Sequence, residues 1–213
     1  VEDVFSTYLY TGTASAITVN NGIDLSGEGG LTWLKSRSLA EAHILMDTTR
    51  GVSSALVSSN SNAAFTLTDG ITAFNSNGFT LGTSNITNTN ASTNVSWTFR
   101  KAEKFFDVVT WTGDGSSPLQ TISHSLGNSP AVIIAKRTDT SGSWWVWHKD
   151  FISNQYYMFL NSTAVQANGG TTLWETTDTT FSVSSAAGLT TSGATYVAYL
   201  FASDAGGFGD DGS

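Results

Sequence analysis

Carboxylates are the side chains of this sequence with the most obvious catalytic potential, and their spacing argues against such a role. A glycosidase built on a β-sandwich needs two carboxylates about 5 to 10 Å apart, commonly presented by alternating acids on one strand. No strand-like stretch carries an E-x-D or E-x-x-x-E pair. Glu28 lies in a glycine-rich loop, Glu41 in a polar turn, and Glu175 directly after Trp174. We interpret them as solvated loop acids and predict no catalytic residue and no enzymatic activity.

Other nucleophiles and metal ligands are equally poorly placed. The serines lack the G-x-S-x-G turn of an activated nucleophile, and the sequence has no cysteine. His43, His124 and His148 lie far apart, and none has a partner at zinc-ligand spacing. Calcium needs about six to eight oxygens, with acids at alternate loop positions, whereas residues 112–116 contain a single acid and 209–212 are short of ligands. The sequence therefore predicts no metal site and no cofactor.

The densest aromatic stretch supplies the candidate binding residues, Trp144, Trp145, Trp147, Tyr156 and Tyr157. In a strand, Trp145 and Trp147 share one face while Trp144 points to the other. Broad rigid rings of this kind could form a stacking platform for sugars or anchor a protein interface. The structural alternative is that both faces are buried, one in a core and one against a neighbouring unit. All three interpretations remain open at this stage.

The elements that position these residues are predicted to be β-strands. Apolar residues alternate with polar ones along most of the chain, and no segment shows convincing helical periodicity. Turn signals such as Asn20-Asn21-Gly22 separate the strand-like runs. The composition agrees, because Ser, Thr, Asn and Gly make the chain soluble in place of charged residues, which are only 12% of the total.

The charge of the chain narrows the range of partners. Its formal net charge is -8, and its nine basic residues are scattered. Nucleic acids and anionic membrane surfaces attract clusters of Lys and Arg, so we predict that the chain binds neither. No apolar run approaches the roughly 20 residues that span a bilayer, and residues 1–4 do not read as a signal peptide. We therefore expect no membrane insertion.

The second half of the chain repeats the pattern of the first at an offset of about 101 residues. At this offset Tyr10-Thr11-Gly12 aligns with Trp111-Thr112-Gly113. The alternation of apolar and polar positions also matches along the rest of the alignment, as far as residues 95–99, which align with 197–201. This period is too long for a solenoid or propeller repeat. We predict two tandem antiparallel β-sandwich units, jelly-roll or lectin-like, each with six to eight strands and packed closely together. The expected bounds are 1–102 and 103–203, followed by a Gly/Asp-rich tail or link at 204–213.

The connector between the repeats holds the only dense cluster of positive charge. It contains Arg100, Lys101 and Lys104, and it has no Pro, Gly or Ser, so it does not read as a flexible linker. The basic residues have no equivalents at Ala202-Ser203. We therefore predict that they contact acids across the seam between the repeats.

Several motifs resemble a known family. They are FSTYLYTG at 5–12, NGIDLSGEGGL at 21–31, AFNSNGFTLG at 73–82, WTFRKA at 97–102, FFDVVT at 105–110, HSLG at 124–127 and YVAYLFASDAGGFG at 196–209. Together they resemble a structural, tail-fibre-like domain that recurs in virion proteins of tailed, mostly marine, bacteriophages. The likeness covers nearly the whole chain.

The resemblance implies a virion component with a lectin-like β-sandwich, and it supplies no catalytic residues. We expect a structural module on the particle exterior, in a tail fibre, an appendage or the capsid surface, assembled in the host cytoplasm. Its partners would be other virion proteins and copies of itself in a homo-oligomer. The alternative is a carbohydrate-binding adhesin that recognises a host-surface glycan.

Overall fold

The computed structural model describes residues 3–203, and this part of the chain is all-β. Its strands form four antiparallel sheets, and its one helical element is a short 3-10 helix at Ser185–Ala187. Internal contacts divide the chain into two compact units, Val1–Lys101 and Ala102–Ser213. The division falls inside the connector identified from the sequence. The tail expected at 204–213 lies outside the described residues.

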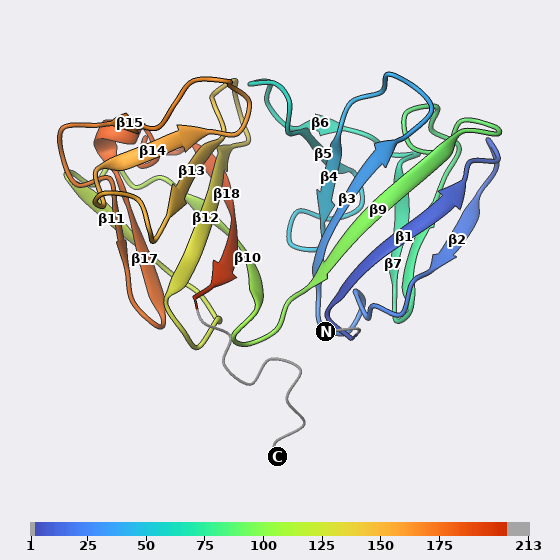
Figure 1. The fold of residues 1–213 in the computed structure, drawn as a ribbon, viewed down its shortest axis with the longest axis horizontal. Helices are drawn as coiled ribbons and strands as arrows, with labels where there is room; N and C mark the ends of the chain where they lie inside the picture. The colour runs from blue at the N-terminus through green and yellow to red at the C-terminus, as the bar shows by residue number, and fades with distance from the viewer. Residues whose placement is uncertain (1–2, 204–213) are drawn as a thin grey trace, which may run out of the picture. The chain divides into compact units, whose positions relative to one another are not determined.

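The first unit contains a six-stranded and a three-stranded sheet (Figure 1). The larger sheet has the order β1-β9-β3-β4-β5-β6 and the smaller one β2-β8-β7. The strands are β1 (Phe5–Thr11), β2 (Ile17–Asn20), β3 (Gly30–Ser36), β4 (Ile44–Asp47), β5 (Ser54–Val57), β6 (Phe65–Thr66), β7 (Ile71–Asn75), β8 (Gly78–Leu81) and β9 (Thr93–Arg100).

The core of the first unit lies between its two sheets. Leu34 and Ile44 on the larger sheet share one buried cluster with Val19 and Phe79 on the smaller sheet. Each of these side chains is at most 2% exposed. The period-2 alternation of the strands places such residues on one face, so two sheets facing each other bury both sets.

The second unit has the same two kinds of sheet. The larger sheet has the order β10-β18-β12-β13-β14-β15 and the smaller one β11-β17-β16. The strands are β10 (Phe106–Thr112), β11 (Leu119–Ser123), β12 (Pro130–Arg137), β13 (Trp145–His148), β14 (Tyr156–Phe159), β15 (Ala167–Asn168), β16 (Trp174–Thr176), β17 (Thr180–Ser184) and β18 (Thr195–Ala202).

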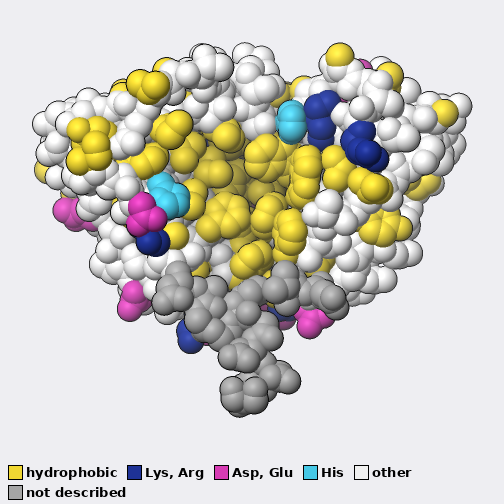
Figure 2. All heavy atoms as spheres, in the orientation of Figure 1, with side chains coloured by type: hydrophobic (Ala, Val, Ile, Leu, Met, Phe, Trp, Pro, Cys, Tyr) yellow, Lys and Arg dark blue, Asp and Glu magenta, His cyan; other side chains and the backbone are white. Residues whose placement is uncertain are grey.

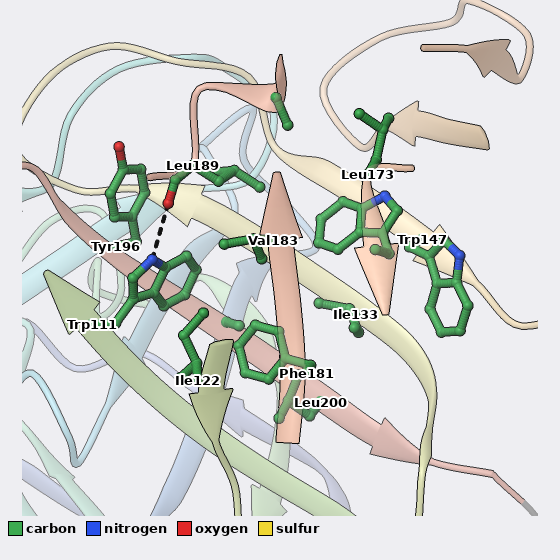
Figure 3. Packing of buried hydrophobic residues seen from close by; sticks show 14 of the residues in the cluster. Trp111, Ile122, Ile133, Trp147, Leu173, Phe181, Val183, Leu189, Tyr196 and Leu200 are labelled. Carbon is green, nitrogen blue, oxygen red and sulfur yellow. Dashed lines mark hydrogen bonds between the residues drawn. The ribbon is translucent and has the colours of Figure 1, made fainter. Parts of the chain in front are cut away.

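Large aromatic rings pack among aliphatic side chains in the core of the second unit (Figure 3). Trp111 stacks on Tyr196 with ring centroids 5.0 Å apart, and it meets Phe181 edge to face at 5.8 Å. The Trp111 indole N–H donates a 3.0 Å hydrogen bond to the Leu189 carbonyl. Burying these large rings removes much apolar surface from water, and the hydrogen bond satisfies the polar group that is buried with them.

The strand orders of the two units are the same. Adding nine to each strand number of the first unit reproduces both sheets of the second. Each unit thus has nine strands within the described residues, which is more than the six to eight that the sequence predicted. The two-residue strands β6 and β15, each at the end of its larger sheet, are too short to show a period of alternation.

Candidate functional site

Two of the five aromatic candidates are buried within the fold. Trp147 is 4% exposed and belongs to the core cluster of the second unit, as Figure 3 shows. Trp144 is fully buried and stacks on Tyr199, with ring centroids 6.3 Å apart and planes at 22°. These two tryptophans therefore do not form an aromatic binding surface. Their burial corrects the sequence prediction for them and favours the packing alternative.

The other three candidates remain partly exposed. Trp145 contacts Tyr157 with ring centroids 4.6 Å apart and Phe159 at 4.9 Å, and Trp145 and Tyr157 flank the core cluster. Tyr156, one residue along β14, points to the opposite face of the strand, where it is also partly exposed. The aromatic surface that the structure supports is therefore Trp145, Tyr157 and Phe159.

Exposed aliphatic side chains gather in the same part of the sequence. Between residues 151 and 165, four large hydrophobic residues are more than a third exposed, namely Ile152 (78%), Met158 (37%), Leu160 (39%) and Val165 (84%).

The larger sheet of the first unit is apolar on the face that points away from the core. Register places Phe5 beside Phe99 and Trp33 beside Trp97, with ring centroids 4.8 Å and 6.2 Å apart. Leu45 lies opposite Trp33 in the same row. These residues alternate with the core residues of their strands, so they occupy the other face. We call this surface the outer face of the first unit.

The larger sheet of the second unit has an equivalent outer face. Phe106, Phe201 and Val132 form one cross-strand row, and Tyr199 lies beside Ile134 in another. The Phe106 ring lies 5.1 Å from that of Phe201 and 6.4 Å from that of Tyr199. A sheet that is apolar on both faces needs a cover on both. Phe106 and Tyr199 on this face are at most 1% exposed, whereas Val132, Ile134 and Phe201 are partly exposed. Each unit therefore has a second apolar face besides the one that packs on its own smaller sheet.

Charged groups occupy little of the surface, and the clearest ion pair is buried. Figure 2 shows charged side chains as a few separate groups among uncharged ones on the face in view. In the first unit, the buried Asp47 carboxylate accepts hydrogen bonds from the Arg50 Nε at 2.6 Å and from the Arg50 backbone N–H at 2.9 Å. Sequence reasoning missed this pair, although an acid and an arginine three residues apart after a strand are a usable signal.

Arg50 also lines a pocket of about 250 Å³. Ser53, Ser54 and Thr66 contribute hydroxyl groups to its lining, and Phe65 contributes a ring. The Arg50 Nη1 donates to the Ser54 hydroxyl at 3.2 Å. Because the Asp47 carboxylate balances the guanidinium charge, the pocket does not present a net positive charge to an anion.

Of the basic residues of the connector, Arg100 lies near an acid of its own unit. Arg100 lies 4.0 Å from the Glu28 carboxylate, and both belong to the first unit. Its side chain is 25% exposed and that of Glu28 is 56% exposed, so this pair contributes little to stability. The predicted pairing of Arg100, Lys101 and Lys104 across the seam stays a prediction. Lys101 packs along Gly29, and Lys104 is exposed with a φ of 57°.

Two buried titratable groups of the second unit organise a turn. The Asp107 carboxylate accepts hydrogen bonds from the backbone N–H groups of Val108 at 2.9 Å and Ser125 at 2.8 Å. The His124 ring accepts from the Leu126 N–H at 3.2 Å. Burial lowers the pKa of His124, which favours the neutral ring. Asp107 and His124 therefore have a structural role, because their side chains bind backbone N–H groups of the turn.

Within residues 3–203, no group of three or more His, Asp or Glu side chains is arranged to hold a metal ion. Asp210 and Asp211, weighed as calcium ligands from the sequence, lie outside this range. None of the helices in the described part of the chain has the length and hydropathy of a membrane span.

Comparison with known proteins places the chain in a family. Residues 2–213 match the family described as Domain of unknown function (DUF7483). The chain belongs to this family. Searches of curated proteins and of solved structures give no match. The family match covers both units. The function of the chain is therefore inferred from the surfaces described above.

Proposed function

We propose that this DUF7483 chain is a non-enzymatic structural module on the exterior of a phage particle, in a tail fibre, an appendage or the capsid surface. It would act by self-assembly and by contact with other virion proteins, after assembly in the host cytoplasm. The observation that carries this proposal is the apolar outer face of each larger sheet, on which aromatic rings remain partly exposed, among them Trp33, Trp97 and Phe201. A sheet face rich in Phe, Trp, Tyr and Leu is suited to packing against other protein surfaces.

We also infer that the two units arose by tandem duplication of one sandwich. The same strand order in both units supports the duplication. So do equivalent details, because Lys35 and Lys136 each donate from Nζ to the carbonyl of the following residue at 2.6 Å.

The test of the proposed function combines particle composition with solution assembly. Mass spectrometry of purified particles of a phage that encodes the chain is expected to find it in many copies, and antibody labelling should mark the particle exterior. Sedimentation velocity of the purified chain is expected to show oligomers. A chain that is absent from particles and monomeric at every concentration contradicts the proposal.

Glycan binding is a second candidate function, because Trp145, Tyr157 and Phe159 form a cluster of partly exposed rings. A host-attachment module would stack a sugar ring on such a surface. A glycan array should then give signals that Trp145→Ala abolishes and that the loop variant Ile152→Ala retains. A blank array removes this alternative.

A further inference from the structure

Strand β1 forms one edge of the larger sheet in the first unit. The Gly12 N–H donates to the Ser92 carbonyl at 2.8 Å, and the Arg100 N–H donates to the Val4 carbonyl at 2.7 Å. These bonds extend the β1–β9 register at both ends, so even-numbered residues of β1 direct their backbone groups toward β9. The odd-numbered residues direct their N–H and C=O groups away from the sheet.

The outward backbone groups of β1 form an open edge. The four residues concerned are Phe5, Thr7, Leu9 and Thr11, and within residues 3–203 their N–H and C=O groups make no hydrogen bond to another part of the protein. The strand has no charged residue and no proline. Leu9 is 58% exposed and Tyr8 is 36% exposed. A long, uncharged edge strand of this kind is a template for pairing with another strand.

The equivalent edge in the second unit is partly protected. In β10 the even-numbered residues point outward, since the Gly113 N–H donates to the Ala194 carbonyl at 2.8 Å. Phe106 exchanges both of its backbone hydrogen bonds with Ala102, at 3.0 and 3.2 Å. The Asp107 carboxylate accepts from the Val108 N–H, and the amide of Gln120 donates to the Thr112 carbonyl at 2.9 Å.

The contrast shows that the edge is more open at β1 than at β10. The buried Asp107 carboxylate occupies the outward N–H of Val108 in β10, so a partner strand cannot use that donor. The equivalent residue of β1 is Ser6, which carries no charge. One of two otherwise similar edges therefore keeps its hydrogen-bonding groups accessible.

We propose that β1 pairs antiparallel with β1 of a second copy of this chain, about a two-fold axis at Tyr8. This inference rests on the proposed self-assembly and identifies the edge through which it occurs. In this register Thr7 lies opposite Leu9 of the second copy and Phe5 opposite Thr11. All four outward residues then exchange hydrogen bonds with outward residues of the other copy.

The chemistry of the strand favours a second copy over another partner. The pairing is self-complementary, so one surface serves both chains, as a two-fold interface requires. Two tyrosines meet at the axis in a non-hydrogen-bonded pair, where side chains approach most closely and aromatic contacts stabilise the sheet. Because β1 is uncharged, two chains of net charge -8 meet there without direct repulsion between strand residues.

The first test is a charge placed on the edge. Leu9→Lys is expected to raise the dissociation constant for self-association at least tenfold, as measured by sedimentation equilibrium. A lysine on an edge strand stays solvated, and the lysines of the two copies would repel each other near the axis. Thr110→Lys is the matched control, since Thr110 is the equivalent exposed, outward residue of the partly protected strand β10. It should change the constant less than twofold. Circular dichroism verifies that both variants are folded.

The second test uses the absence of cysteine from the chain. Under mild oxidation Tyr8→Cys should form a covalent dimer, because paired residues at the axis have Cα atoms within the range that a disulfide bridges. Ser6→Cys is the control. In the proposed register its two copies lie four residues apart along the strand direction, which is about 13 Å and too far to cross-link.

The outcomes separate the edge from the proposed function. If the wild type assembles but Leu9→Lys assembles equally well, or Tyr8→Cys cross-links no faster than Ser6→Cys, then the edge inference is wrong while self-assembly stands. If the wild type is monomeric at every concentration and absent from particles, the proposed function fails, and the edge inference fails with it.

Discussion

At the scale of residues, the buried pair of Asp47 and Arg50 is the strongest electrostatic contact of the first unit. Removing one partner leaves a charge without compensation in a region where the Asp47 side chain has no exposure. Arg50→Ala is expected to lower the free energy of unfolding by about 3–5 kcal/mol, as measured by urea denaturation.

Two further variants determine whether charge burial is the cause of that loss. The double variant Asp47→Asn/Arg50→Met should lose less than Arg50→Ala alone, because it leaves no buried charge. Arg137→Ala, which breaks the partly exposed 2.9 Å pair with Asp139, should cost less than about 1 kcal/mol. Equal losses for Arg50→Ala and Arg137→Ala contradict this account.

Lys136 is a buried base whose protonation opposes folding. Burial lowers its pKa from 10.5 to about 8, and nearby Asp139 only partly offsets that effect. Between these two values the unfolded chain binds more protons than the folded one, so the free energy of unfolding rises with pH. Lys136→Met is expected to be more stable than the wild type at pH 7, by at most about 3 kcal/mol, and to lack this rise.

The measurement is urea denaturation at intervals from pH 7 to 9.5, compared between the wild type and Lys136→Met. The range stops there because burial raises the pKa of Tyr10, which makes stability fall again above about pH 10. Lys149→Met controls for the loss of one positive charge at an exposed site. Parallel pH profiles for the wild type and Lys136→Met show that the lysine is not the source of the slope.

At the scale of elements, Gly12 and Gly113 directly follow the first strand of their units, where the backbone lies very close to a neighbouring loop. A Cβ at Gly113 would lie 2.1 Å from the Thr191 carbonyl oxygen, and one at Gly12 would lie 2.1 Å from that of Thr89. Gly113→Ala and Gly12→Ala are each expected to cost about 1–3 kcal/mol of unfolding free energy by denaturation. Gly142→Ala, whose Cβ would meet nothing closer than 3.7 Å, should be within about 0.5 kcal/mol of the wild type.

At the scale of the whole molecule, the net charge sets how association responds to salt. Copies with a formal charge of -8 repel one another, and salt screens that repulsion. We expect the association constant to rise between 10 and about 150 mM NaCl, as measured by sedimentation equilibrium, because the proposed edge contains no ion pair that salt would weaken. Association that weakens over this range indicates that ion pairs hold the copies together.

The sequence by itself determined the all-β class and the alternation of the strands. It placed Trp145 and Trp147 on one strand face and Trp144 on the other, as the structure has them, because side-chain parity is a property of the strand alone. It did not determine that Trp147 enters the core while Trp145 stays partly exposed, nor that Arg50 is held by a buried acid.

Only the tertiary structure decided which strands form the sheet edges and which outward groups find partners there. Ser6 and Asp107 occupy equivalent positions, yet the difference between them matters only because β1 and β10 both lie at edges. Periodicity is local and readable from neighbouring residues. The order of strands, and with it the open edge at β1, depends on pairings between residues as far apart as Phe5 and Phe99, which no local pattern encodes.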